Sequence, residues 1–291
     1  MEYNVYIVKC DDPFCSWFHG FKEDCDSFPE QCLYEVGYAN IGSTFGVLVR
    51  DLFPLKFTNG NTVNPRPAFG CGYNQEVANG VRPPYTDGVL GLGNRNTTIL
   101  AQLHRLGLMR NICGHCFSAQ GGGYLLMGDH ILPSSEIVWA PLLSKSDEYV
   151  LGPAEFRFDG QATGVEYLLV FFDSGSTYTI FGSRAYEALL NGLNKTLNRS
   201  QLKIANDDKT LPVCWNGTKA FKSIGDVTNL FKPLSLRFTN SKNVQLRLSP
   251  EAYLIVSDRG NVCLGILSGA EFGRTGTITI GGIHYELPKF S

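Results

Sequence analysis

Apolar and polar residues alternate over much of this chain, which predicts a protein built mainly from strands. Residues 32–57 alternate around a glycine-rich centre, as a long hairpin does. The run YLLVFF, residues 167–172, is typical of a strand that is buried on both faces. Further strands are predicted by the short segments PAFGCGY, DGVLGLG, GGGYLLMGD, IVWAPLL, EFRFDG, LSLRF, VQLRL, YLIVS, VCLGIL and TITIGG.

Two segments have helical spacing instead. Residues 96–108 repeat apolar side chains at Ile99, Leu103 and Leu106 behind polar capping residues, and residues 183–197 form the second candidate helix. Each half of the chain thus holds an apolar strand, a glycine-rich turn and one short helix. A polar stretch lies between the halves, so we expect two domains, residues 1–148 and 149–291.

The bulk composition is that of a globular protein and narrows the choice of partners. Of 291 residues, 43% are apolar and 18% are charged, which argues against extensive disorder. The net charge of -2 offers no long-range attraction to a polyanion, so we expect no nucleic-acid partner. No apolar run is long enough to span a membrane as a helix.

Nine cysteines indicate an oxidising compartment. Four of them lie within residues 10–32, which predicts a loop closed by disulfides, although the spacing does not determine which cysteines pair. A zinc site is the alternative. It is disfavoured because the spacings are not those of paired CxxC ligands and only His19 lies nearby. Four N-glycosylation sequons, which are common in secreted proteins, begin at Asn96, Asn194, Asn198 and Asn216.

The amino terminus disagrees with secretion, because MEYNVYIVKCDD has neither a basic leader nor the apolar stretch of a signal peptide. Either the chain is not secreted or its true beginning is missing, and the cysteine count favours the second explanation. We therefore expect a protein of the secretory pathway.

Several motifs suggest chemistry that their context does not support. CGHC at residues 113–116 has the spacing of a redox centre, but FSAQGGG follows it and cannot form the helix that lowers the pKa of such a cysteine. QGGGY lacks the pattern of a phosphate loop. The five histidines are scattered, and we interpret them as surface or packing residues. We expect neither a metal nor a cofactor.

The segment FFDSGST, residues 171–177, carries the strongest signal. An apolar strand ends at an acid, Asp173, inside a turn of small residues, and a helix follows. A carboxylate on such a turn accepts hydrogen bonds from backbone N–H groups and hydroxyls, which fix its orientation. The turn residues Ser174, Gly175, Ser176 and Thr177 are therefore candidate supports for a catalytic Asp173.

This layout resembles a half-site of the pepsin-like aspartic proteases, and the resemblance extends along most of the chain. YEVGYANIGSTFGVLVRD resembles the flap hairpin of that family, with Tyr38 at the tyrosine position and Gly42, Ser43 and Thr44 at the tip. DGVLGLG and TITIGG resemble the apolar-apolar-glycine elements of the two lobes. The cysteine pattern, GCGYNQ, LPVCWNG and NVCLGIL resemble the plant nucellin-like branch, which implies a disulfide between Cys214 and Cys263.

The resemblance implies a mostly β, bilobal fold with a few short helices, no cofactor, and an extracellular or vacuolar location. It also implies a monomer that binds a polypeptide substrate or protein ligand in the cleft between the lobes. It implies an endopeptidase in which two aspartates, one from each lobe, activate a water molecule. The first Asp-Thr-Gly turn precedes the flap in the family, and residues 1–10 already match the region after that turn. We therefore expect a partial first lobe without its catalytic strand, and a second lobe whose last strands are incomplete.

Since the chemistry needs both acids, we expect this chain to be inactive by itself. The alternative function is that of a non-catalytic, protease-like binding or inhibitor protein. A third possibility, in which two copies of the second lobe each supply Asp173, is disfavoured because the flap and the first-lobe segments would obstruct such packing.

Overall fold

The computed structural model describes residues 5–21, 25–38, 42–57, 59–76, 88–117, 123–128, 137–144, 146–198, 200–242, 244–282 and 289–290. Within them strands predominate, which confirms the prediction of a mostly β protein. The chain divides into two compact units: Met1–Cys113 with Leu126–Ile131, and Gly114–Leu125 with Leu132–Ser291.

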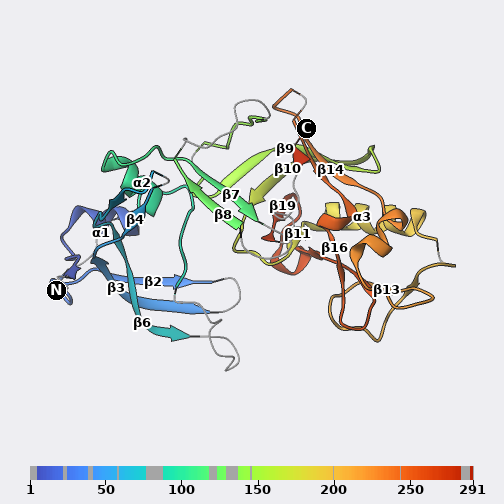
Figure 1. Ribbon diagram of the computed structural model, residues 1–291, viewed down its shortest axis with the longest axis horizontal. Helices are drawn as coiled ribbons and strands as arrows, with labels where there is room; N and C mark the ends of the chain where they lie inside the picture. The colour runs from blue at the N-terminus through green and yellow to red at the C-terminus, as the bar shows by residue number, and fades with distance from the viewer. Residues whose placement is uncertain are drawn as a thin grey trace. The chain divides into compact units, whose positions relative to one another are not determined.

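The first unit is organised around a four-stranded sheet with β3 at its centre (Figure 1). Strands β2 and β3 form the predicted hairpin, and β6 pairs with the other edge of β3. The elements before residue 128 are β1 (Tyr6–Ile7), α1 (Pro13–His19), β2 (Leu33–Gly37), β3 (Ser43–Arg50), β4 (Leu55–Lys56), β5 (Thr62–Val63), β6 (Ala68–Glu76), α2 (Ile99–Arg105), β7 (Cys113–Phe117) and β8 (Gly123–Met127). Most of β7 and the first part of β8 belong to the second unit.

Helix α1 lies within the segment that the cysteine count predicts as a loop. The Asp12 side chain caps it by accepting a hydrogen bond from the backbone N–H of Phe14 at 2.8 Å, and Pro13 occupies the first turn. Gly20 ends the helix with a left-handed φ of 80°, which glycine adopts without strain. These start and stop signals were in the sequence, so the helix was predictable from them.

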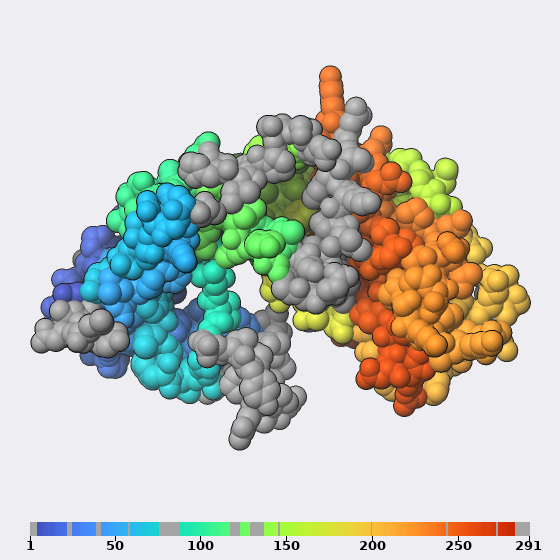
Figure 2. Space-filling model, in the orientation of Figure 1, coloured from blue at the N-terminus to red at the C-terminus, as the bar shows by residue number. Residues whose placement is uncertain are grey.

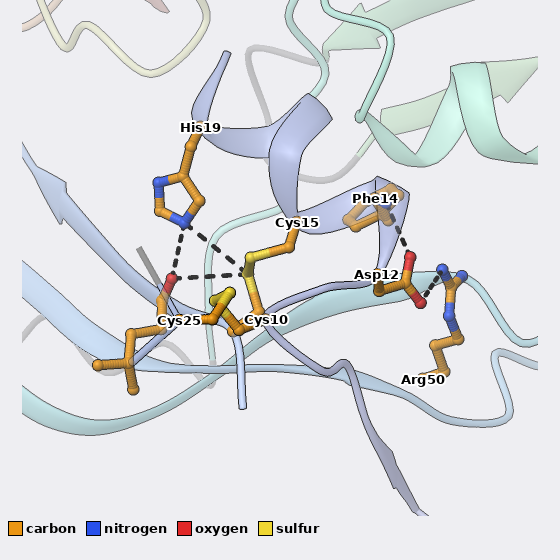
Figure 3. The surroundings of a disulfide bond; sticks show 9 residues. Cys10, Asp12, Phe14, Cys15, His19, Cys25 and Arg50 are labelled. Atoms are coloured by element: carbon orange, nitrogen blue, oxygen red, sulfur yellow. Dashed lines mark hydrogen bonds and ion pairs between the residues drawn. A yellow bond between two sulfur atoms is a disulfide. The ribbon is translucent and has the colours of Figure 1, made fainter. Parts of the chain in front are cut away.

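Two disulfides close this segment, which confirms the prediction of disulfides. Cys10 pairs with Cys25, and Cys15 pairs with Cys32 (Figure 3). The second bond ties α1 to the residue before β2. It lies in a small core with Val8, Phe14, Tyr34, Leu48 and Ala68.

The second unit contains an eight-stranded sheet with the order β18-β11-β19-β10-β9-β14-β15-β20 and a four-stranded sheet with the order β12-β13-β17-β16. Figure 2 shows its orange and red segments as a closely packed surface. Its elements are β9 (Tyr149–Phe158), β10 (Gln161–Phe172), β11 (Thr179–Phe181), α3 (Ser183–Thr196), β12 (Lys203–Ile204), β13 (Cys214–Asn216), η2 (Ile224–Asp226), η3 (Thr228–Leu230), β14 (Leu234–Phe238), β15 (Gln245–Leu248), η4 (Pro250–Ala252), β16 (Leu254–Val256), β17 (Val262–Leu264), β18 (Ile266–Ser268), η5 (Ala270–Phe272), β19 (Thr277–Ile280) and β20 (Lys289–Phe290).

Helix α3 covers the core of this unit. Ala185, Leu189 and Leu193 recur every four residues on one face, and each is at most 1% exposed. They join the same core as Phe156 and Phe181, whose rings meet edge to face at 5.4 Å. Burial of each large apolar side chain contributes about 1.5–3 kcal/mol, so this packing fixes the strands that carry Asp173.

Three of the predicted strands differ from the structure. The run YLLVFF belongs to β10, but it is not buried on both faces, because Tyr167 is 78% exposed at a left-handed φ of 61°. Register shifts on either side of Leu168 indicate a bulge that turns the chain there. Residues 137–143 and 88–93 are outside any strand, since their apolar runs form no ladder; Asp87 lies outside the described residues.

Candidate active site

Asp173 lies where β10 leaves the sheet. Strand β10 ends at Phe172, and after a short turn the chain returns to the sheet as β11. These two strands are not neighbours, because β19 lies between them, parallel to β10 and antiparallel to β11. The turn that carries Asp173 therefore passes over the end of a strand that comes about a hundred residues later in the chain.

Backbone hydrogen bonds hold Asp173 on this turn. Its N–H donates to the carbonyl of Ile280 at 3.0 Å, which extends the pairing of β10 and β19 by one residue. Its Oδ1 accepts from the N–H of Gly175 at 3.0 Å, and its own carbonyl accepts from the N–H of Ser176 at 3.2 Å. The carboxylate is thus oriented by the main chain and exposed to solvent, as a group that acts on a bound molecule must be.

The end of β19 locks the other half of the turn. Gly282 donates its N–H to the carbonyl of Ser176 at 2.5 Å. A side chain on Gly281 would place its Cβ 2.3 Å from the carbonyl oxygen of Tyr178, so only glycine fits there. Gly281 also donates to Oγ1 of the fully buried Thr179 at 3.0 Å.

The four predicted support residues differ in their hydrogen bonds and in their exposure to solvent. Ser176 Oγ donates to the carbonyl of Tyr178 at 3.1 Å, which stiffens the turn, and Gly175 supplies its N–H to Asp173. Ser174 and Thr177 are exposed. Our sequence analysis did not find the buried hydroxyl of Thr179, although a threonine at the start of a strand after a small-residue turn was a usable signal.

The hairpin assigned to the flap belongs to the first unit, and Asp173 belongs to the second. Gly37 pairs with Ser43, and the N–H of Tyr38 donates to the carbonyl of Gly42 at 2.7 Å. Residues 39–41 lie outside the described residues, and Ser43 and Thr44, which were predicted at the tip, belong to β3 and pair with β2. Burial, and to a smaller extent the neighbouring Tyr34, raises the pKa of Tyr38.

A disulfide and a buried aspartate, Asp208, hold the four-stranded sheet of the second unit and the loops next to it. Cys214 and Cys263 are bonded across β13 and β17. Asp208 is 5% exposed, and its carboxylate accepts hydrogen bonds at 2.6–3.0 Å from Ser257 Oγ, the Thr210 N–H and Asn261 Nδ2. These hydrogen bonds hold the pKa of Asp208 well below its usual range, against the smaller effect of burial.

Two groups of side chains have the spacing of metal ligands among the described residues. Cys15, His19 and Cys32 form one, and Asp208, Cys214 and Cys263 form the other. In both groups the sulfur atoms are joined as a disulfide. A disulfide sulfur is not a thiolate, so neither group binds a metal in the oxidised chain.

The CGHC segment forms strand β7 and not the start of a helix. Cys113 packs against the core around α2, whereas Cys116 is exposed, and neither forms a disulfide. The strand offers no helix amino terminus to activate either of them. The structure therefore supplies no support for a redox centre here.

The four sequons lie at accessible positions. Asn96, Asn194 and Asn198 are exposed, and Asn216 is half-buried on β13. The Asn198 side chain accepts from both the N–H and Oγ of Ser200, at 3.0 and 2.8 Å. Asn194 lies on α3, in the last turn of the helix.

In the described part of the chain, no helix combines the length and the apolar character that crossing a membrane requires.

Comparison with known proteins identifies relatives over nearly the whole chain. Residues 2–129 match the family model described as "Xylanase inhibitor N-terminal", and residues 153–287 match "Xylanase inhibitor C-terminal". The chain is 38% identical to an aspartic proteinase of Oryza sativa subsp. japonica over 290 residues, which covers 95% of this chain and 70% of that protein. It is 27% identical to "Aspartic proteinase 39" of Arabidopsis thaliana, covering 90% of this chain and 54% of that one.

Solved structures share the fold. Basic 7S globulin from soybean superposes with a TM-score of 0.71 at 16% sequence identity, covering 97% of this chain and 76% of that chain. The structure titled "edgp" superposes with a TM-score of 0.69 at 17% identity, covering 97% and 78% of the two chains. At sequence identities this low, the structural similarity is evidence for a shared fold alone.

Proposed function

This chain belongs to the pepsin-like aspartic protease family, and from that premise we propose that Asp173 is one of the two carboxylates of an aspartic endopeptidase site. One observation carries the proposal: the exposed carboxylate of Asp173 is oriented by the N–H of Gly175 at 3.0 Å on a turn that β19 holds in place. Such preorganisation is what acid–base catalysis requires of a side chain.

The proposed reaction divides its work between two acids. Two carboxylates about 3 Å apart cannot both ionise, so one takes a proton from the attacking water while the other gives a proton to the scissile peptide group. The polypeptide is the substrate, and the hairpin with Tyr38 is proposed to cover it. Among these 291 residues Asp173 alone lies in an Asp-(Ser/Thr)-Gly triplet. We therefore propose that these residues do not hydrolyse peptides without a second such acid.

A chimera with the rice relative tests this proposal. These 291 residues would replace the matching part of the rice aspartic proteinase, and hydrolysis of a peptide library would be followed at acidic pH. We expect hydrolysis by the chimera, a loss of several orders of magnitude in Asp173→Asn, and none by the 291 residues alone. Asp207→Asn is the matched control, since its side chain is 79% exposed and pairs with Arg259. Equal hydrolysis by the chimera and by Asp173→Asn would refute the proposal.

A second candidate function is binding without hydrolysis. The observation that favours it is that both halves of the chain match models described as parts of a xylanase inhibitor. The partner would then be a secreted glycoside hydrolase, and inhibition of a xylanase by the 291-residue chain is the direct measurement. Inhibition that survives Asp173→Asn would favour this function, and failure to inhibit or bind the enzyme would count against it.

We also propose that the protein passes through the secretory pathway as a monomer. The three disulfides support this location, because such bonds persist in oxidising compartments. Glycans would then be attached at Asn96, Asn194, Asn198 and Asn216. Enzymatic removal of N-glycans from the purified protein, followed by mass spectrometry of each sequon, tests the modification, and sedimentation tests the oligomeric state.

A further inference from the structure

Three potential metal ligands meet in the first unit, at the end of α1. Cys15 and His19 are four residues apart and therefore on one face of the helix, and Cys32 directly precedes β2. The two sulfur atoms and a ring nitrogen of His19 all lie within 4.8 Å of one another (Figure 3). We propose that these three side chains form a zinc site when the disulfide between Cys15 and Cys32 is reduced.

The distances fit a tetrahedral zinc ion after a small movement. Bonds of about 2.3 Å to sulfur and about 2.0 Å to nitrogen place neighbouring ligand atoms about 3.5–3.8 Å apart. Cys32 Sγ is already 3.8 Å from His19 Nε2. The two sulfur atoms must move apart by about 2 Å, which side-chain rotation provides because their Cα atoms are 5.8 Å apart.

The surroundings favour zinc over an unoccupied pair of thiols. Cys15 is 0% and Cys32 1% exposed, in a core with Val8 and Phe14. Two thiolates and one neutral imidazole around Zn²⁺ have no net charge, which lowers the cost of burying the ion. His19 Nε2 donates to the carbonyl oxygen of Leu33 at 3.0 Å, so the ring must exchange this hydrogen bond for the bond to zinc. A water molecule completes the fourth position.

The two states are related by a balanced exchange. A dithiol reductant breaks the sulfur–sulfur bond, transfers two electrons and two protons to Cys15 and Cys32, and closes to its own cyclic disulfide. Zn²⁺ then displaces both thiol protons as the thiolates bind it. In either state α1 is cross-linked to the start of β2, so the metal replaces the disulfide under reducing conditions.

Substitution of His19 distinguishes a specific three-ligand site from thiols that bind zinc adventitiously. His104 is the matched control, since it lies in the last turn of α2, as His19 does in α1, and its ring nitrogen is also 3.0 Å from a backbone carbonyl, that of Met109. His19→Gln and His104→Gln would be prepared in a full chain that carries Cys10→Ser, Cys25→Ser, Cys214→Ser, Cys263→Ser, Cys113→Ser and Cys116→Ser. The thiols of the other two disulfides and of the CGHC segment then do not compete for the ion.

The test is titration of the reduced chain with Co²⁺ and then Zn²⁺, followed by absorption and far-ultraviolet circular dichroism. We expect one tetrahedral Co²⁺ with thiolate charge-transfer bands, displaced by Zn²⁺, with affinity at least about tenfold weaker in His19→Gln and unchanged in His104→Gln. The oxidised chain should bind no ion there. The proposal is overturned if the reduced chain binds no ion, if His19→Gln binds as tightly as its parent, or if the ion binds only to an unfolded chain.

Discussion

The two units of this protein reach stability in different ways. The second unit buries one continuous apolar core of 29 described residues, to which α3, the strands of the large sheet and the 3₁₀ turns contribute. The core around α1 in the first unit contains seven described buried residues, two of which are the disulfide partners Cys15 and Cys32. The comparison teaches that cross-links in the first unit perform the task that apolar burial performs in the second.

The largest expected effect comes from removing the cross-links where the core is small. Replacing Cys10, Cys15, Cys25 and Cys32 by serine should cost the first unit about 2–5 kcal/mol for each disulfide and expose residues 10–33 to hydrogen exchange. Replacing Cys214 and Cys263 is the control, because the larger core should keep the second unit folded. Equal loss of protection in both units would contradict the comparison.

The next effect tests the core of the second unit. Leu189→Ala on α3 removes a side chain that is 0% exposed, so it should lower the free energy of unfolding by about 2–5 kcal/mol. Glu187→Ala on the same helix should change it by less than about 0.5 kcal/mol. Urea denaturation of both variants measures this difference, and similar midpoints would show that α3 is not part of a cooperative core.

A smaller effect is expected at the turn that carries Asp173. Gly281→Ala would bring a Cβ within 2.3 Å of the Tyr178 carbonyl oxygen, so we expect a loss of about 1–3 kcal/mol and slower hydrolysis by the chimera. Gly276→Ala, at the residue before β19, is the control, because its Cβ would have no neighbouring atom within 4 Å. Normal activity and stability of Gly281→Ala would mean that the turn does not depend on this close approach.

The smallest effect is a dependence of stability on pH. The pKa of Asp208 is lower in the folded chain than in the unfolded chain, where it is about 3.9. Its ionised form therefore stabilises the fold above about pH 4, and this contribution is lost as the pH falls further. Asp208→Asn should flatten the fall in the free energy of unfolding between about pH 5 and 2. Identical slopes for wild type and Asp208→Asn would contradict this assignment.

Much of the second unit could be predicted from the sequence, because its signals are local and periodic. The candidate helix at 183–197 is α3, and the segment TITIGG is β19 with Gly281 and Gly282 at its end. Asp173 became a candidate site residue through the strand, turn and helix predicted around it. The hydrogen bond from its N–H to Ile280 could not be read from the residues near it, because the partner is far away in sequence.

The first unit was harder to predict for a physical reason. Cysteine-rich polar segments suggest loops, and the cap at Asp12 and the stop at Gly20, which specify α1, were not considered in the prediction. The exposed Tyr167 in β10 was missed because a continuous apolar run gives no sign of the bulge that turns the chain there. The pairing of the four clustered cysteines required coordinates, since four cysteines allow three pairings.

The insertion of β19 between β10 and β11 also sets an order of events during synthesis of the chain. The residue that supports Asp173 from β19, Ile280, lies 107 positions after it. At about 5–20 residues per second, a ribosome needs about 5–20 s to make that interval. Throughout that time the turn at Asp173 lacks its central strand, so a nascent chain has no preorganised acid until translation has almost reached the last residues shown here.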